Sequence, residues 1–357
     1  MDELLYQHPL DLGQIIRLLS VETPHEIEQV LARACAIKQE YIDNKVYVRG
    51  LIELSNICRK NCMYCGVRRD NRGVHRYDIP DAEVLETVRH AMEEGYTSLV
   101  IQSGERTDQV FVRRIDRLLR KILALSNHGM GITLSCGEQN PGTYRRWADS
   151  GAHRYLLRIE TTNRDLFRRI HPRDGSHLYD NRVKALQCLR ETGYQVGTGV
   201  MIGLPGQTVE DLAHDLLFFR DIDVDMVGMG PYIEHEMTPL HSEKDCLWSM
   251  EKRLEKSLLM IAVLRLIMKD INIAAATALD VLSHEGRTMA FHAGANVLMP
   301  NITPVQYRED YLIYKGKPVL QEANDLISRI GPGLPRGTQI DFSGWGNSKN
   351  YARRMAR

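Results

Sequence analysis

Three cysteines stand close together in the first fifth of the chain, at Cys58, Cys62 and Cys65, with three and then two residues between them. They directly follow an apolar run at 46–54 that is typical of a buried strand. Structural zinc normally takes four ligands, and no further Cys or His completes this set as an obvious pair in the sequence. Three thiolates suit a 4Fe–4S cluster that leaves one iron without a protein ligand, because a closed electron-transfer cluster is held by four. The spacing therefore favours one open cluster over a zinc knot.

The loop around these cysteines also carries basic residues and a glycine, namely Arg59, Lys60, Gly66, Arg68 and Arg69. Thiolates that bind a cluster are anionic, so nearby cations compensate their charge, and glycine permits the unusual backbone geometry that such loops need. The alternative for the basic residues is an ordinary solvated loop.

From about residue 46, short apolar runs alternate with helical patterns, which is the rhythm of βα units. We expect strands at 46–54, 97–103, 130–136, 154–160, 194–202, 225–231, 271–277 and 295–300. Eight parallel strands close a barrel, so the sequence predicts an α/β protein with a (β/α)8 TIM-type barrel at 46–304. A helical extension at 1–45 precedes the barrel, and a tail at 305–357 packs on it. A doubly wound open sheet is the alternative, because the spatial order of strands cannot be read from sequence.

Helix start and stop signals support this division. Pro80 and Asp81 open an amphipathic segment that Gly95 ends, and Thr208 with Asp211 forms a capping-box pattern before an apolar stripe. Two helices are expected within 9–42 and one near 320–330.

Composition excludes several functional classes. The 357 residues contain 46 Lys plus Arg and 46 Asp plus Glu, so the formal net charge is zero and nothing favours binding to nucleic acid or an anionic membrane. No apolar stretch approaches the ~20 residues that span a bilayer, and the acidic amino terminus lacks a signal-peptide pattern. The 7 cysteines, an odd number, fit a metal site in a reducing compartment better than a disulfide framework. We expect a soluble cytoplasmic protein.

The cysteine spacing after the first strand of a βα barrel, with Tyr64 before the third cysteine, resembles the radical S-adenosylmethionine (SAM) superfamily. This resemblance implies reductive cleavage of SAM to a 5′-deoxyadenosyl radical. Over most of the chain the resemblance is narrower, to the HydE family of FeFe-hydrogenase maturases, with methylornithine synthase and biotin synthase as more distant relatives. The segments that carry it are 51–71, 100–105, 154–161, 199–208, 225–233 and 294–304.

The resemblance also implies SAM-binding residues. Glu160 would hold the ribose hydroxyls, Arg182 would pair with the methionine carboxylate, and the segment Ser103, Gly104 and Glu105 would accept hydrogen bonds from the SAM ammonium. Arg158 and Glu160 alternate in a predicted strand and so share one face, where two inward charges would be costly without partners. The alternatives are a plain βα turn at 102–105, a structural Arg158–Glu160 ion pair and a surface position for Arg182.

For the substrate we single out polar residues that stand among apolar ones near strand ends: Gln102, Thr133, Ser135, Arg158, Thr277 and Tyr307. By the resemblance they line the cavity below SAM. Thr133 and Arg158 together would anchor the carboxylate of a cysteine-ligated iron precursor. Because Arg158 precedes Glu160 by two strand positions, we expect it about 7 Å deeper, beyond SAM.

Many HydE chains carry a second iron–sulfur site in the carboxyl-terminal region, but the last cysteine here is Cys246, so we expect one cluster. Cys136 and Cys188 are interpreted as small buried hydrophobic residues. The predicted function is SAM radical chemistry in assembly of the FeFe-hydrogenase cofactor, with ferredoxin or flavodoxin as electron donor and the other maturases as partners. The alternatives are a radical SAM mutase acting on an amino acid, like methylornithine synthase, and an iron–sulfur carrier without turnover.

Overall fold

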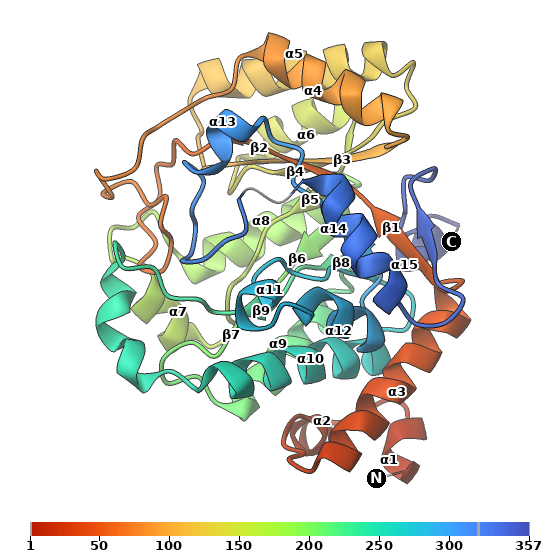
Figure 1. The fold of residues 1–357 in the computed structure, drawn as a ribbon. Helices are drawn as coiled ribbons and strands as arrows, with labels where there is room; N and C mark the ends of the chain where they lie inside the picture. The colour runs from red at the N-terminus through yellow and green to blue at the C-terminus, as the bar shows by residue number, and fades with distance from the viewer. Residues whose placement is uncertain (1, 320–321, 357) are drawn as a thin grey trace.

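A curved sheet of parallel strands runs through the centre of the molecule, and helices surround it (Figure 1). The computed structural model describes residues 2–319 and 322–356. Seven strands pair in the order β10-β8-β6-β5-β4-β3-β2, all parallel. The strands are β1 (Lys45–Val48), β2 (Gly50–Ser55), β3 (Ser98–Ser103), β4 (Gly131–Ser135), β5 (Ala152–Leu156), β6 (Gln195–Thr198), β7 (Met201–Ile202), β8 (Met226–Val227), β9 (Gly230–Pro231), β10 (Asn272–Ile273), β11 (Val297–Leu298) and β12 (Gln339–Asp341).

Strand β11 closes the sheet into a ring. On one side the Asn296 amide donates to the carbonyl of Ile273 at 2.9 Å, and on the other the Arg49 amide donates to the carbonyl of Leu298 at 2.9 Å. The register pairs Val297 with Tyr47 of β1. The seven strands plus β11 make eight, so the predicted (β/α)8 barrel is confirmed and the open sheet is not what the chain forms.

The helices expected within 9–42, after Pro80, after Thr208 and near 320–330 are present, and the structure adds helices that the sequence did not indicate, at 2–6, 305–308 and 349–355. The helices are α1 (Asp2–Tyr6), α2 (Leu12–Leu19), α3 (Pro24–Tyr41), α4 (Asp81–Glu93), α5 (Gln109–Leu125), α6 (Pro141–Asp149), α7 (Arg164–Ile170), α8 (Tyr179–Glu191), α9 (Val209–Asp221), α10 (Met250–Ile267), α11 (Leu279–Leu282), α12 (Gly286–His292), α13 (Val305–Arg308), α14 (Ala323–Ile330) and α15 (Lys349–Met355), with 3-10 turns η1 (Pro239–Cys246) and η2 (Gly331–Gly333). Helix α4 begins at Asp81, and Gly95 behind it has a positive φ of 87°. The capping box of Thr208 and Asp211 opens α9. Residues 320–321 of the predicted tail helix lie outside the described residues.

The outer helices bury apolar side chains against the strands. Helix α5 places Phe111, Ile115, Leu118 and Ile122 in the core, all fully buried, while its charged residues face outward. Burial of each such side chain contributes about 1.5–3 kcal/mol, so these stripes supply much of the energy that holds the helices on the barrel. Helices α4, α5 and α6 lie along one side of the barrel, and α9 and α10 lie along the opposite side (Figure 1).

The end of the tail closes the amino-terminal mouth of the barrel. Strand β12 pairs in parallel with β1, and the carbonyl of Gly346 accepts hydrogen bonds from Arg49 at 2.9 Å and from Asn272 at 2.8 Å. Arg154, fully buried, donates to the carbonyl of Trp345 at 2.5 Å. These bonds place residues 345–346 as a plug beneath the barrel interior.

An earlier part of the tail crosses the opposite, carboxyl-terminal mouth. The Gly66 amide donates to the carbonyl of Ile313 at 3.0 Å, and Lys317 reaches inward to pair with the buried carboxylate of Glu53 on β2. A Cβ on Gly66 would lie 2.0 Å from the carbonyl oxygen of Leu312, so only glycine permits this approach. The tail therefore covers part of the cysteine loop.

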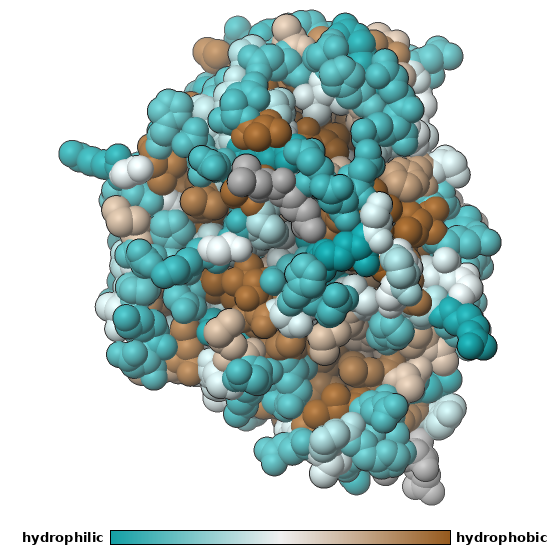
Figure 2. Space-filling model, in the orientation of Figure 1, coloured by the Kyte–Doolittle hydropathy of each residue, from teal (hydrophilic) through white to brown (hydrophobic). Residues whose placement is uncertain are grey.

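The outer surface is mainly hydrophilic in the view of Figure 2, with hydrophobic residues in small patches between polar ones. Within the described residues, no helix is long and apolar enough to pass through a bilayer.

Candidate active site

The cysteine loop leaves the carboxyl end of β2, and one arginine pins it in place. The guanidinium of Arg76 donates to the carbonyls of Asn56 at 2.7 Å, Val67 at 2.8 Å, Arg68 at 2.6 Å and Asn71 at 3.0 Å. Backbone carbonyls that a helix or sheet would otherwise pair are thus paired with a fixed cation. The loop is therefore held from both ends although it has no regular secondary structure.

The turn after β3 packs directly on the first cysteine. The Glu105 amide donates to the sulfur of Cys58 at 3.3 Å, a contact that stabilises a thiolate. A Cβ on Gly104 would lie 2.4 Å from the carbonyl oxygen of Ile57, so the two loops meet this closely only because residue 104 is glycine.

The three thiols lie in a low-dielectric pocket near one another. Burial, and then the negative charge of Cys58, raises the pKa of Cys62 to about 12, and burial, followed by the charges of Cys62 and Cys58, raises the pKa of Cys65 further. Buried thiolates at neutral pH need a cation to offset these costs, and an iron cluster supplies it. No three His, Cys, Asp or Glu side chains of the described residues meet at a point suited to a single metal ion. A 4Fe–4S cluster has no need of such a point, because each thiolate binds a different iron. The donor set fits the cluster.

Tyr64 lies between the cysteine loop and α7. Its hydroxyl is 3.4 Å from Nε2 of His171, whose Nδ1 is 2.9 Å from the carbonyl of Phe167. Burial holds the pKa of His171 well below its usual value, so the ring is neutral, Nδ1 donates to that carbonyl and Nε2 is an acceptor. Burial likewise raises the pKa of Tyr64, so it stays a neutral phenol beside Cys62.

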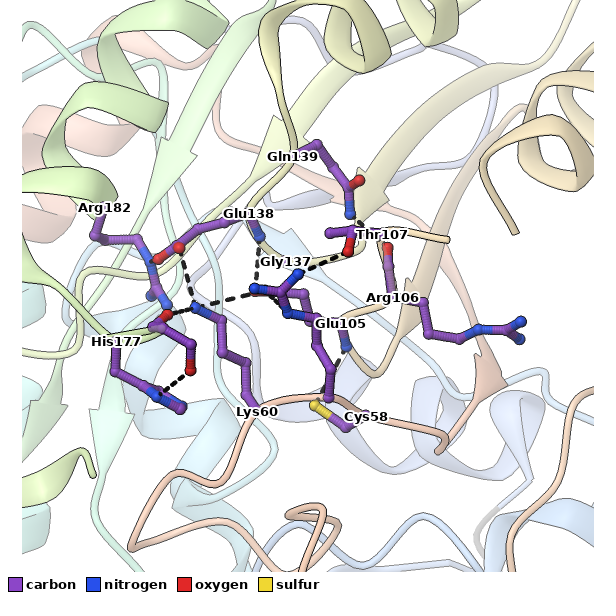
Figure 3. A network of polar contacts seen from close by, with 12 residues as sticks. Cys58, Lys60, Glu105, Arg106, Thr107, Gly137, Glu138, Gln139, His177 and Arg182 are labelled. Atoms are coloured by element: carbon purple, nitrogen blue, oxygen red, sulfur yellow. Dashed lines mark hydrogen bonds and ion pairs between the residues drawn. The ribbon is translucent and has the colours of Figure 1, made fainter. Parts of the chain in front are cut away.

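Behind the cysteine loop, two cations and two carboxylates form a buried network (Figure 3). Lys60 donates to Glu138 at 3.0 Å and lies 3.5 Å from Glu105, and Arg182 donates from Nε to Glu138. Although burial acts to raise it, the charges of Arg182 and Lys60 hold the pKa of Glu138 below its usual value. The network places Arg182, only 7% exposed, inside the barrel mouth and not on the surface.

Glu105 differs from Glu138 in having one oxygen that accepts no hydrogen bond. Its Oε2 accepts a hydrogen bond from the Glu138 amide at 2.8 Å, whereas its buried Oε1 has no hydrogen-bond donor among the described residues and lies 3.5 Å from both Lys60 and Arg59. Burial raises the pKa of Glu105 more than Lys60 lowers it. The two cations offset the charge of Oε1, and an ammonium group is the kind of ligand that would donate the missing hydrogen bond.

Glu138 was not among the residues singled out from the sequence. The signal was present, because Cys136, Gly137 and Glu138 follow β4 just as Ser103, Gly104 and Glu105 follow β3. The two glutamates thus occupy equivalent positions on neighbouring strands, and parallel strands bring such positions together.

Arg158 and Glu160 lie together, but not as a continuous strand would place them. Strand β5 ends at Leu156, and Glu160 has a positive φ of 69°, so the expectation of an extended strand through residue 160 is wrong. Arg158 turns back and donates from Nε to both carboxylate oxygens of Glu160, at 3.1 and 3.0 Å. It is therefore not a strand step deeper than Glu160. The structural ion pair considered above is present.

Thr133 lies on the wall of a cavity inside the barrel, together with Val100, Leu156, Gly228 and Ala274. Its hydroxyl accepts a hydrogen bond from Nε of Arg154 at 2.7 Å, so its cationic neighbour is Arg154 and not Arg158. Arg49 lines this cavity, and Arg154 is beside it through its bond to Thr133. Arg49 was missed because it lies inside an apolar run that is typical of a core strand, and Arg154 because it stands at the first position of such a run.

The remaining predicted substrate residues are placed at different depths. Gln102 on β3 donates to the hydroxyl of Tyr311 at 3.3 Å, and the register of the strands puts Ser135 beside it. Thr277 lies in the turn after β10. Tyr307 instead donates to Glu83 of α4 at 3.1 Å, so the structure gives it a partner on an outer helix, and the fully enclosed tyrosine of this tail segment is Tyr311.

The sequence of this chain is similar to those of known proteins. Residues 52–219 match the radical SAM superfamily. The [FeFe] hydrogenase maturase subunit HydE of Thermotoga maritima is 42% identical over 81% of this chain and 80% of its own length. The 3-methylornithine synthase of Methanosarcina acetivorans is 26% identical over 91% of this chain and 90% of its own.

Solved structures share the fold at lower identity. A crystal structure of methylornithine synthase has a TM-score of 0.80 at 23% identity and covers 99% of this chain and 98% of its own. A crystal structure of the maturase HydG has a TM-score of 0.81 at 18% identity, covering all of this chain and 77% of that one. These likenesses establish the barrel and its extensions.

Proposed function

Because the chain belongs to the radical SAM superfamily and, within it, is a HydE-like maturase of FeFe-hydrogenase, we propose that its barrel binds one 4Fe–4S cluster and SAM and acts on a cysteine-ligated iron precursor. The observation that carries this proposal is the meeting, at one barrel mouth, of the three-cysteine loop with a buried acid–base network that contains a carboxylate oxygen without a hydrogen-bond donor. Parallel barrels assemble their active sites at this end.

Cys58, Cys62 and Cys65 would hold the cluster, with the Glu105 amide on the first sulfur. When bound, the reduced cluster supplies the electron that cleaves SAM to a 5′-deoxyadenosyl radical. The chain itself keeps water out with the tail over Gly66 and presents Tyr64 and the network of Lys60 beside the loop. Exclusion of water protects a radical from side reactions.

For SAM, we propose that Arg182 pairs with the methionine carboxylate, that Ser103, Gly104 and Glu105 receive the ammonium, and that Glu160 takes the ribose hydroxyls. The buried position of Arg182, and the Oε1 of Glu105 that lacks a hydrogen-bond donor, support the first two assignments. Arg182 is pre-oriented by Glu138, so it meets a carboxylate without loss of side-chain freedom.

Thr133 and Arg49 line a cavity of about 20 Å³ beneath this network, so the substrate would enter the barrel interior only if lining side chains move. The buried guanidinium group of Arg49 at this cavity favours an anionic substrate. Gln102, Arg158, Thr277 and Tyr307 are also proposed to contact the substrate. The ion pair with Glu160 holds the Arg158 side chain beside that carboxylate.

Hydrogenase activation tests this function. Anaerobically reconstituted protein, supplied with the other maturases and hydrogenase apoprotein, should restore hydrogen evolution, and Cys62→Ala should abolish it together with SAM cleavage. About four irons per chain are expected. Eight would contradict the single cluster, and SAM cleavage without hydrogenase activation would contradict the maturase role.

A mutase acting on an amino acid is the second candidate, favoured by the close fold match to methylornithine synthase along the whole chain. Formation of methylornithine from lysine, followed by mass spectrometry, would support it over the first.

We propose an acidic one-electron carrier, ferredoxin or flavodoxin, as the electron donor, and a cytoplasmic location. Residues 58–76 contain six Lys or Arg and one Asp, a local charge of 6 − 1 = +5 in a neutral chain. Arg59, Arg69 and Arg72 of this segment are exposed. Such a patch steers an acidic protein toward the cluster. Charge reversal at Arg72 should slow reduction by flavodoxin but not by dithionite.

A further inference from the structure

Helix α9 carries a buried carboxylate that the chemistry above does not use. Asp215 is 0% exposed, and no cation lies among the groups that interact with it. Its Oδ1 accepts hydrogen bonds from the amide of Thr162 at 2.7 Å and from the hydroxyl of Thr162 at 2.6 Å. Its Oδ2 has no hydrogen-bond partner among the described residues. A carboxylate that is buried without a cation lowers the stability of the fold. Its retention here indicates that the hydrogen bonds to Thr162 serve another purpose.

Thr162 belongs to the turn that begins at Glu160. Glu160 occupies the left-handed region at φ 69°, which a residue with a side chain adopts at a cost of about 1–3 kcal/mol unless the surroundings fix it. Its own amide and carbonyl bond to Gly199 and Met201 of the next strand, both at 3.0 Å. These bonds hold one side of the turn only.

The other side of the turn is held by α9. One turn of helix before Asp215, Asp211 accepts a hydrogen bond from the side-chain amide of Asn163 at 2.8 Å. Asn163 in turn caps α7, with its Oδ1 accepting from the amides of Asp165 and Leu166. Asp211 and Asp215, one helical turn apart on α9, therefore accept hydrogen bonds from the two consecutive residues 162 and 163, which follow Glu160.

We propose that Asp215 is a positioning residue, which fixes the left-handed turn at Glu160 and thereby aims the Glu160 carboxylate at SAM. This inference rests on the proposed contact between Glu160 and the SAM ribose. Burial raises the pKa of Asp215 to about 7, so the carboxyl is largely neutral under mildly acidic conditions and acts as a hydrogen-bond acceptor and not as a charge. Asn in its place keeps the accepting oxygen.

The test measures the dissociation constant of SAM for the cluster-loaded enzyme by anaerobic calorimetry. Asp215→Ala should weaken SAM binding about tenfold, whereas Asp215→Asn should stay within about twofold of the wild type. Thr162→Val removes only the hydroxyl donor and should give a smaller loss of SAM affinity. This variant provides the test if Asp215→Ala does not fold. Cluster content is measured for every variant.

Asp225 provides the matched control. It is also 0% exposed and accepts a backbone hydrogen bond, from Val196 at 2.8 Å, but it lies at the amino-terminal end of β8. Asp225 also pairs with Arg354 at 2.7 Å, so Asp225→Ala removes more contacts than Asp215→Ala does, yet it should leave SAM affinity unchanged. An equal loss in this control would show general destabilisation and overturn the positioning role.

The double variant separates this inference from the function on which it rests. In a Glu160→Gln background, Asp215→Ala should cause no further loss, because the group it aims is already altered. If Glu160→Gln alone leaves SAM affinity unchanged, the proposed ribose contact fails. If Glu160→Gln weakens binding while Asp215→Ala does not, the contact stands and the positioning role is wrong.

Discussion

At the scale of single residues, Arg182 joins the protein network to the proposed SAM site. It is buried, and its Nε is occupied by Glu138. Arg182→Leu removes the cation and leaves Glu138 with Lys60 alone, so we expect SAM affinity to fall by about 1.5–3 kcal/mol, roughly ten- to hundredfold. Anaerobic titration with SAM measures this. Arg190→Leu, on the outer end of the same helix, is the control. Unchanged affinity in Arg182→Leu would remove it from the site.

Asp215 also makes a prediction about stability against pH. Its pKa is raised by burial to about 7, while in the unfolded chain it is about 4. Between about pH 4 and about pH 7 this carboxyl is ionised in the unfolded chain and protonated in the folded protein. The unfolding free energy of the wild type therefore falls by up to about 1.4 kcal/mol for each unit of increase in pH. Asp215→Asn has no such loss. The unfolding free energy of the variant minus that of the wild type, measured at pH 5.5, 7 and 8, should increase up to about pH 7 and then stay constant. An equal difference at all three pH values would contradict the raised pKa of Asp215.

At the scale of elements, two loops depend on glycine to meet. The Cβ of Gly104→Ala would fall 2.4 Å from the carbonyl oxygen of Ile57, a backbone atom that cannot yield without moving the cysteine loop. We expect iron content after reconstitution to fall well below half of the wild-type value. Gly13→Ala in α2 meets its nearest neighbour at 3.5 Å and should retain full iron. Full iron in Gly104→Ala would show that the loop tolerates displacement.

The strands and their order along the chain could be predicted because each apolar run is long enough to be read as a strand, and eight of them close a barrel. The end of β5 could not, because the run through Ile159 stays apolar while the backbone turns at Glu160. The cysteine loop was visible from spacing alone. Arg49, Arg154 and Asp215 were not, since a buried charge has no periodic signature and its partners lie far away in the sequence.

At the scale of the whole molecule, the tail closes the barrel at its amino-terminal end. Gly346 has a φ of 61°, and an added Cβ would lie 2.7 Å from the ring of Tyr47. Gly346→Val should lower the unfolding temperature by several degrees, because it strains the left-handed backbone of the plug and displaces the carbonyl of residue 346 from Arg49. Thermal unfolding of the cluster-loaded protein measures this, and SAM affinity should be unchanged because the plug lies at the opposite end from the cysteines. A large loss of SAM affinity would mean that the two ends are coupled.

The same tail has a consequence for the order of events during synthesis. The cysteine loop emerges from the ribosome early. Ile313, which bonds to this loop, and Lys317, which pairs with Glu53, emerge only after all the barrel strands, and the plug at Gly346 emerges later still. Contacts between such distant parts of a chain form late in folding. The nascent protein therefore exposes its three thiols while the strands are already being made. The loop is therefore most open during this interval, and docking of the tail then covers part of it.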